Sequence, residues 1–472
     1  NLHGQMPEPY YVEFNLLTSG SALPKMVLIP VLLPHEMMHC IWRAGPLQRM
    51  VSLYGEAGED GLSEFWTHSL PLPWAQAHPG LAAMRSDPAN MMKNTFPVRV
   101  HCDGAEVFRN NEFFIWDWGS ATVLQGHVAD AKFPAVLIPH WMMRDHAVKN
   151  NVHRVVAEVF AWSFIALQSG TAPLRGLKGE EFNPLSYRAK LAGLPLMEGH
   201  TAVFVGWKGD GKARKECHFF FKRNWSCRDC CDECHATQPF ARTPPDLLYT
   251  DTRPTARWRG TFISHESYVA NCAAHELSPW AVVPGFRKEL VFRDGMHDQC
   301  LGVQRDLAGT IIAELLDHGW LAGASVNEQL RGLWLEFIVW CKAQHIKPPR
   351  GTFSLSLIGW TKRTMYPELS TSYKAVVIKL LCSFLASKVQ TCNTGNEHDN
   401  VRALTAWAMS EWCHVVDHSD QWPKTEEIHR MEFAMRCYVF GYSWLATEAA
   451  SMNKFMWKLR PNFLIWSITW MR

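Results

Sequence analysis

The stretch Thr201-Ala-Val-Phe-Val-Gly-Trp207, followed directly by Lys208-Gly-Asp210-Gly211, decides the fold prediction for this chain of 472 residues. Its continuous apolar run is typical of a strand buried on both faces. Glycine and aspartate directly after such a run indicate that the strand ends there. An aspartate at the end of a buried strand can also bind a metal ion at the edge of a sheet. The stretch therefore predicts an element and a candidate site residue together.

Three more strand-like runs precede this one, and a helical pattern separates them from it. The runs lie at 96–101, 112–118 and 135–139, and apolar residues recur at helical spacing over 151–168. The first run ends at Cys102-Asp103-Gly104, which is a second Asp-Gly pair after a strand. The order β-β-β-α-β, with aspartates after the first and fourth strands, is the layout of an RNase H-like sheet.

The rest of the chain divides by texture into accessory, cysteine-rich and helical parts. The predicted fold class is α/β plus α: a mixed sheet with flanking helices, a zinc-knuckle insert and a mostly helical C-terminal region. Helices are expected over 298–317, 325–343, 371–390, 401–417 and 425–457, and the second opens with a capping box, Ser325-Val-Asn-Glu328, in which Ser325 is the N-cap. The predicted parts are an N-terminal accessory region (1–92), the first part of the core (93–222), the cysteine-rich insert and connector (223–285), the last core strand and helix (286–320) and the helical region (321–472).

Composition limits the kind of protein this can be. The chain is 47% hydrophobic and 19% charged, which excludes wholesale disorder. A net charge of +2 means that any nucleic-acid binding must come from local patches. No run approaches the roughly 20 apolar residues of a membrane helix, so no membrane association is expected. We expect a soluble intracellular protein, in which clustered cysteines bind metal more often than they form disulfides.

Three aspartates follow predicted strands: Asp103, Asp210 and Asp294. Phosphoryl transfer with Mg²⁺ or Mn²⁺ needs carboxylates that converge on one point, and neighbouring strand ends can supply them. The alternative is that Asp-Gly after a strand is simply a turn. The pattern makes these three residues candidate catalytic ligands.

A cysteine cluster gives the sharpest local signal. Cys227, Cys230, Cys231 and Cys234 form overlapping C-x-x-C pairs, a spacing that lets two thiolates reach one Zn²⁺. Because adjacent Cys230 and Cys231 cannot easily face one ion, a distant ligand is allowed, and His297 is the candidate. The alternative is that the cysteines are incidental and buried.

Basic residues gather around the second aspartate. A phosphate backbone beside a carboxylate site would be positioned by such residues, although a solvated helix face has the same pattern. Arg253, Arg257 and Arg259, interleaved with Trp258, form a weaker second candidate. The residues of the first patch are Lys208, Lys212, Arg214, Lys215, Lys222 and Arg223.

In their order, these motifs resemble the transposases of CACTA-like and Plavaka-like cut-and-paste elements. The resemblance covers about 93–320 and extends more loosely through the helical remainder. It is carried by Val100-His-Cys-Asp-Gly104, Gly206-Trp-Lys-Gly-Asp-Gly211, the knuckle ending Cys234-His-Ala236, Ser278-Pro-Trp280 and Asp294-Gly-Met-His297.

The resemblance implies a DDE transposase with an RNase H-like catalytic domain. Strand nicking and strand transfer would depend on Mg²⁺ or Mn²⁺, on transposon-end and target DNA in the nucleus, and a homo-oligomer is allowed. Asp103 resembles the first catalytic aspartate and Asp210 the second. Asp294 and His297 resemble a D-x-x-H element, in which the histidine is structural or metal-linked.

The sequence departs from the family at the last acid, usually a glutamate on a helix beyond a helical insertion. Here 466–472 is an apolar, Trp-rich tail. Either Asp294 or Glu314 substitutes, or the third acid is missing and the protein is inactive. We predict Asp294 as the third ligand, and DNA binding without cleavage if its carboxylate turns towards His297. The alternatives are a non-catalytic, zinc-stabilised DNA- or protein-binding derivative, and an unrelated metalloenzyme that binds one metal through His297 and Asp298.

Overall fold

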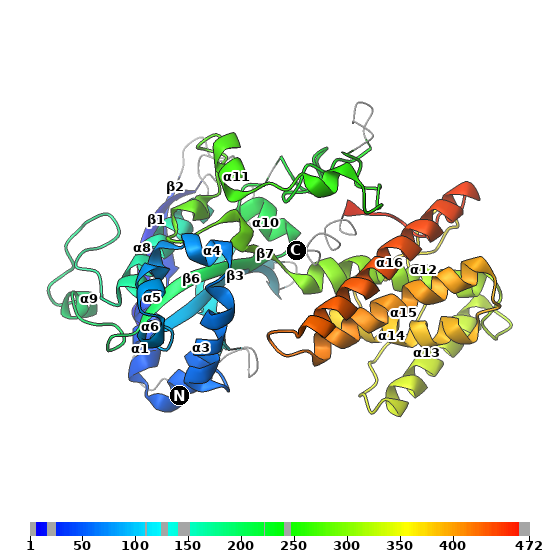
Figure 1. Ribbon diagram of the computed structural model, residues 1–472, viewed down its shortest axis with the longest axis horizontal. Helices are drawn as coiled ribbons and strands as arrows, with labels where there is room; N and C mark the ends of the chain where they lie inside the picture. Colours follow the sequence, from blue (N-terminus) through cyan, green and yellow to red (C-terminus); the bar gives the residue numbers. More distant parts are fainter. Residues whose placement is uncertain are drawn as a thin grey trace. The chain divides into compact units, whose positions relative to one another are not determined.

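A computed structural model describes residues 6–16, 25–108, 111–123, 131–139, 152–220, 222–239 and 247–461. The chain divides into two compact units. Unit 1 comprises Asn1–Phe221 and Ser264–Arg293, and unit 2 comprises Lys222–Ile263 and Asp294–Arg472. Figure 1 shows a sheet within unit 1 and long helices within unit 2, in agreement with the expected α/β plus α class.

Unit 1 is built on a five-stranded mixed sheet with the order β5-β4-β3-β6-β7. β3 pairs antiparallel with β4 and parallel with β6, while β4 pairs antiparallel with β5 and β6 pairs parallel with β7. Only β4 therefore runs against the other strands. All five core strands predicted from the sequence are present. Their bounds are β3 Thr95–Phe108, β4 Asn111–Ser120, β5 Phe133–Pro139, β6 Thr201–Gly209 and β7 Val291–Arg293.

Helix α8 (Val152–Ser169) covers one face of this sheet with an aromatic layer. Phe164 meets Phe204 of β6 with ring centroids 5.8 Å apart, and Phe160 meets Trp280 at 5.3 Å. Trp280 in turn lies 5.0 Å from Trp116 of β4. Large apolar side chains at helical spacing on α8 thus face large apolar side chains on the strands, and burying them supplies much of the stability of unit 1.

Residues 1–92, expected to be an accessory region, belong to the same compact unit as the sheet. The Leu32 amide donates to the Ala135 carbonyl at 2.9 Å, and the Trp66 indole donates to the Thr95 carbonyl at 2.7 Å. A hairpin of β1 (Tyr10–Leu16) and β2 (Lys25–Val31) was not predicted. The helices of this region are α1 Pro34–Arg43, α2 Pro46–Arg49, η1 Met50–Tyr54, α3 Gly58–Ser69, α4 Pro73–Ala77, η2 Pro79–Leu81, α5 Ala82–Ser86 and α6 Pro88–Met91.

Short helices complete unit 1 and link its strands. They are α9 Tyr187–Leu191, α10 Gly211–Cys217, α11 His265–Asn271, η7 Pro279–Val282 and η8 Lys288–Leu290.

Unit 2 combines the cysteine-containing loop with a helical core. The expected N-cap at Ser325 is confirmed, because its hydroxyl accepts from the Glu328 amide at 3.3 Å. No helix in the described ranges is long and apolar enough to cross a membrane. The helices of unit 2 are η6 Arg257–Gly260, the π-helix η9 Met296–Val303, α12 Gln304–Asp317, α13 Val326–Ala343, α14 Ala375–Thr391, α15 Glu397–His418 and α16 Thr425–Ser451.

Candidate metal centre

Asp103 lies inside β3. The sequence had indicated that it follows the end of a strand, so this expectation is corrected. β3 continues to Phe108 along β4, and Asp103 pairs with Ile115. What ends beside Asp103 is the pairing with β6, whose last pair joins Cys102 to Gly209. Asp103 is therefore the first residue of β3 beyond the end of β6, and it lies at the edge where that parallel neighbour stops.

Asp210 follows β6 directly and begins α10. As the N-cap, its Oδ1 accepts from the Ala213 amide at 2.6 Å, which satisfies one of the amides left open at the helix start. The local sequence thus explains why the chain turns here. Because β3 and β6 are parallel neighbours, the turn also holds Asp210 close to Asp103.

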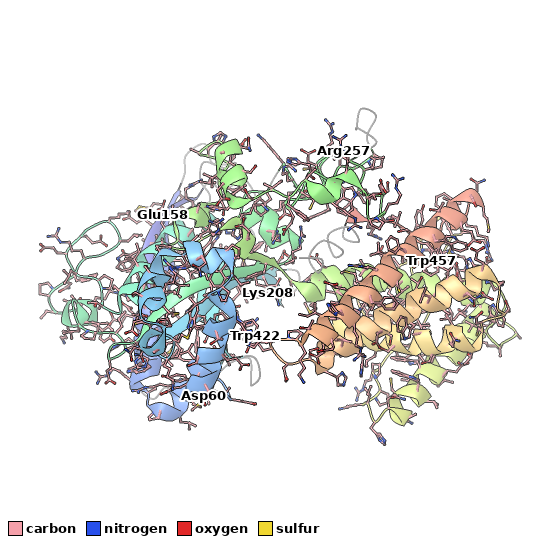
Figure 2. All side chains as sticks on the ribbon, viewed as in Figure 1. Asp60, Glu158, Lys208, Arg257, Trp422 and Trp457 are labelled. Carbon is pink, nitrogen blue, oxygen red and sulfur yellow. The ribbon has the colours of Figure 1, made fainter. Side chains whose placement is uncertain are left out.

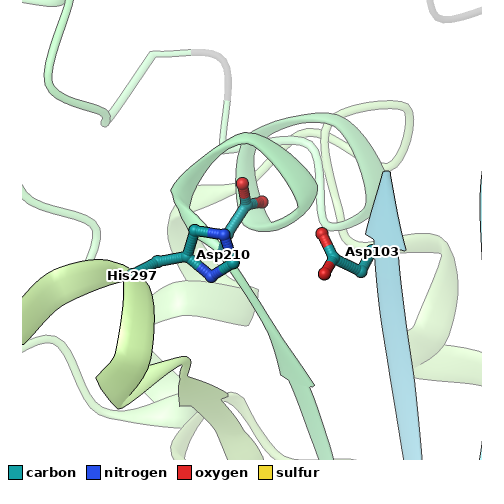
Figure 3. A group of neighbouring side chains, drawn as sticks. All are labelled: Asp103, Asp210 and His297. Atoms are coloured by element: carbon teal, nitrogen blue, oxygen red, sulfur yellow. The ribbon is translucent and has the colours of Figure 1, made fainter. Parts of the chain in front are cut away.

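Asp103 and Asp210 form a group with His297, in the first turn after β7 (Figure 3). One ligand atom from each residue lies within 4.8 Å of the other two. Among the described residues, no other three histidine, cysteine or acidic side chains come so close. All three are half-buried, so an ion can reach them. Carboxylate oxygens suit Mg²⁺ and Mn²⁺, and imidazole suits transition metals, so the donors fit a divalent cation.

Asp294 is not part of this group and its carboxylate is turned towards His297, which is the arrangement for which DNA binding without cleavage was predicted. Its Oδ2 accepts from His297 Nδ1 at 2.6 Å, and its Oδ1 accepts from the Met296 amide at 3.2 Å. The chain enters the π-helix directly after β7, and this turn brings the Asp294 carboxylate back onto its own helix. A carboxylate behind a histidine fixes the ring and its tautomer, so a metal would be bound through His297 Nε2.

His297 was also the candidate for a distant ligand of the cysteine cluster. The group that holds it contains no cysteine. Glu314, the other candidate third acid, is buried on α12 and accepts hydrogen bonds from three donors of unit 2: Trp457, His398 and Arg402.

Glu112 of β4 is a neighbouring charge that the sequence analysis missed. Its carboxylate binds Lys212 of α10, with Nζ at 2.9 and 3.0 Å from the two oxygens. A Cβ added to Gly104 would lie 2.1 Å from Glu112 Oε1. The glycine after Asp103 therefore lies beside the end of the flexible Glu112 side chain, within an extended strand and not in a turn. Only the register of β3 against β4 could have revealed this.

The predicted basic patch includes one buried side chain. Arg214 is 3% exposed, donates to the Val291 carbonyl and lies over the Phe220 ring, so the prediction that it contacts nucleic acid is wrong. α10 turns this side chain onto the sheet, where it links the helix to β7. Lys208, Lys212 and Lys215 are half-buried.

The second basic candidate does not present its aromatic ring. Trp258 is fully buried, and its indole donates to the Asp251 carbonyl at 2.8 Å. Arg259 packs on that ring with its guanidinium carbon 4.3 Å from the centroid. Base stacking on Trp258 is therefore blocked.

The cysteine loop has a small core of its own. Cys230, Cys231 and Cys234 are buried with Tyr249 and Trp258. A hydrogen bond with Cys231, together with burial, raises the pKa of Cys234. Cys227 lies apart from this core, half-buried, and accepts from the Asn224 amide group at 3.2 Å. The structure thus brings Cys231 and Cys234 together, without a third described ligand within 4.8 Å of both.

No protein-family model matches the chain, and no curated protein matches it.

Proposed function

We propose that this protein is a divalent-metal-dependent, DNA-processing protein of the DDE transposase type. The observation that carries the proposal is the convergence of Asp103, Asp210 and His297 within 4.8 Å at the edge of the sheet. Two of these residues are the ones that match the first and second catalytic aspartates in the resemblance. DNA is the substrate that this resemblance implies, with the nucleus as the place of action.

The strand order supports the RNase H-like part of the proposal. β3 is central, β4 alone is antiparallel, and β6 and β7 add in parallel on the other side. An RNase H-like sheet is expected to have this order, with acids on its first and fourth strands. In this chain, Asp103 lies on the first core strand, β3, and Asp210 directly follows the fourth core strand, β6.

Each residue of the centre has a distinct part in the proposed chemistry. A bound divalent cation supplies Lewis-acid polarisation of a phosphoryl oxygen. Asp103 and Asp210 would hold it through oxygen, and His297, oriented by Asp294, through Nε2. Lys212 lies two residues after Asp210 and would position a phosphate of the DNA backbone.

A second candidate is DNA binding without cleavage. It is favoured by one observation: the Asp294 carboxylate is turned towards His297, which leaves two carboxylates in the group. Two-metal catalysis usually needs more carboxylate charge than this. Both candidates bind a metal ion and DNA, and only the first cleaves the DNA.

The test begins with metal binding and continues with cleavage. Mn²⁺ affinity of the full chain is measured by calorimetry for the wild type, Asp103→Asn, Asp210→Asn and the control Asp60→Asn, an exposed acid on α3 (Figure 2). We expect at least a tenfold loss in the first two variants and none in the control. Equal affinity in all four proteins would refute the metal centre.

Cleavage is then assayed as Mn²⁺-dependent nicking of supercoiled and terminal-repeat DNA. Nicking that disappears in Asp103→Ala supports the catalytic candidate. DNA binding without nicking in the wild type supports the non-catalytic candidate. If DNA neither binds nor is cut, the whole proposal fails.

A structural Zn²⁺ in the cysteine loop belongs to the same proposal. Cys231 and Cys234 would be the first two ligands, with one or both of Cys227 and Cys230 joining after a change of rotamer and a distant ligand or water filling any remaining position. Zinc content near one per chain should fall in the double variant Cys231→Ser/Cys234→Ser, with loss of local structure at 223–240. Unchanged zinc in that variant would contradict the assignment.

A further inference from the structure

A histidine pair in the last turn of α15 lies outside the site described above. His414 and His418 are four residues apart, so they lie on the same helical face, one turn from each other. Their ring centroids are 4.2 Å apart, and both side chains are exposed. Two imidazoles at this spacing on a helix can bind one metal ion together, as in the metal-binding H-x-x-x-H pattern.

The tautomer of one ring is fixed by its contact with the backbone. His418 Nδ1 lies 2.7 Å from the His414 carbonyl oxygen. Because a carbonyl oxygen only accepts, this nitrogen carries the proton and Nε2 carries the lone pair. Metal-bound histidines commonly donate their other N–H to a carbonyl in this way. The helix thus prepares His418 as a ligand before any metal arrives.

The surroundings of the pair also favour a cation. The C-terminus of a helix carries partial negative charge from its open carbonyls. Two cations of neighbouring helices are paired with acids of α15, Lys379 with Asp417 at 2.6 Å and Arg430 with Glu411 at 2.6 Å. An incoming ion therefore meets the helix dipole and two imidazoles without an unbalanced positive neighbour among these groups.

We propose that His414 and His418 form a binding site for a divalent transition-metal cation of the Zn²⁺, Ni²⁺ and Cu²⁺ class. Imidazole nitrogen favours these ions, and Cu²⁺ binds most tightly among them. Mg²⁺ prefers oxygen ligands and is not bound here. Water or an outside ligand completes the coordination, because the two rings face solvent. This site does not depend on the proposed function.

The experiment uses the full chain stripped of metal, with Ni²⁺ and Cu²⁺ as probes. Calorimetry compares the wild type with His414→Gln, His418→Gln and the control His429→Gln, an exposed histidine on α16. The Asp103 group and the cysteine loop are also proposed metal sites. The quantity to compare is therefore the Ni²⁺ binding event that is present in the wild type and weakened in a variant. We expect each of the first two variants to lose at least tenfold in Ni²⁺ affinity for one equivalent, and the control to lose none.

A second readout is thermal unfolding with and without Ni²⁺. Ligand that binds only the folded state raises the unfolding midpoint, so the wild type should gain more than the double variant His414→Gln/His418→Gln. Identical isotherms and identical Ni²⁺-induced shifts in the wild type and the double variant would overturn the proposal. An equal loss of affinity in His429→Gln would overturn it as well, since it would show scattered surface binding.

Discussion

The charged cluster around Glu314 in unit 2 and the acids at the sheet edge differ in burial and in how their charges are balanced. In unit 2, Glu314 is 5% exposed. Its carboxylate accepts hydrogen bonds from Trp457 Nε1 at 2.6 Å (Figure 2), His398 Nε2 at 3.2 Å and Arg402 Nη1 at 3.4 Å. At the sheet edge, Asp103 and Asp210 are half-buried and converge with an imidazole. The first arrangement is buried among donors and cations from its own helices, and the second is half-buried at the edge of the sheet.

The difference separates a structural cluster from the proposed metal centre. Burying a carboxylate is tolerated when donors and cations neutralise it, so the Glu314 network holds helices together. Like charges that converge beside solvent cost stability unless a cation joins them, and such sites are typical of metal binding. Mutations should therefore affect stability in the first region and ligand binding in the second.

The largest expected effect is on the stability of unit 2. Arg402 is fully buried and links Glu314 to Asp399, with Nη2 donating to Asp399 at 2.7 Å. Arg402→Met should lower the free energy of unfolding by about 3–5 kcal/mol, because it leaves buried carboxylates without their cation. Urea unfolding followed by helical circular dichroism measures it. The exposed Arg331→Met on α13 is the control and should change it by less than about 0.5 kcal/mol.

The same measurement on Asp103→Asn sharpens the contrast. Because Asp103 is half-buried, this substitution should change the free energy of unfolding in metal-free buffer less than Arg402→Met does. A loss comparable with that of Arg402→Met would show that the two regions do not differ in the way described.

Asp294→Asn should have the next largest effect, on metal affinity. Removal of a carboxylate that orients a ligating histidine typically weakens metal binding by about 10–100-fold. Mn²⁺ calorimetry should show a loss in this range, smaller than in a variant that lacks both Asp103 and Asp210. If Asp294→Asn has no effect, then His297 is not a ligand, and if it matches the double variant, Asp294 itself binds the metal.

A pH dependence of stability is expected from His398. Burial alone would lower its pKa, but hydrogen bonds and charges from Glu314 and Glu448 outweigh burial and raise it. Because the pKa of His398 is raised in the folded state, protonated His398 stabilises the fold fully below its ordinary pKa of 6.5. This contribution is lost as the pH rises through the pKa of the folded state. Arg402, His318 and Asp399 are the other charged or titratable groups nearby.

The check is the difference in unfolding free energy between the wild type and His398→Gln from pH 5 to 9. This difference should shrink as pH rises. The pKa of Glu314 is lowered in the folded state, burial being outweighed by His398, Trp457 and Arg402, so its contribution is lost only in acid, outside this window. A constant difference would mean that His398 contributes packing and not charge.

The smallest expected effect concerns DNA at the sheet edge. Glu112 and Lys212 are each about one-third exposed, so their ion pair is weak and exchangeable. Glu112→Gln should raise DNA affinity severalfold by releasing Lys212, and Lys212→Met should lower it and reduce the salt slope by about one. Fluorescence anisotropy at several salt concentrations measures both, with the exposed Lys190→Met as control. If both variants raised DNA affinity, or both lowered it, the proposed exchange of Lys212 between Glu112 and a DNA phosphate would be contradicted.

The sequence by itself determined the core strands, the main helices and the two aspartates of the candidate site, but not the β1–β2 hairpin. Alternation, apolar runs and helical spacing predicted β3, β6 and α8, and Ser325 predicted the start of α13. Asp103 and Asp210 could be placed together because both were expected at one edge of a sheet, and they do lie there although β3 continues past Asp103. These features depend on residues close in sequence or on a rule of sheet topology.

Only the tertiary structure decided where the remaining charged side chains point. Asp294 and His297 face each other because the chain enters a π-helix, Arg214 turns inward to the β7 backbone, and Glu112 crosses to Gly104 through the β3–β4 register. Glu314 is buried among donors that lie 84 to 143 residues away in sequence. The direction of a side chain depends on which distant groups pack around it, and no local pattern in the sequence contains that information.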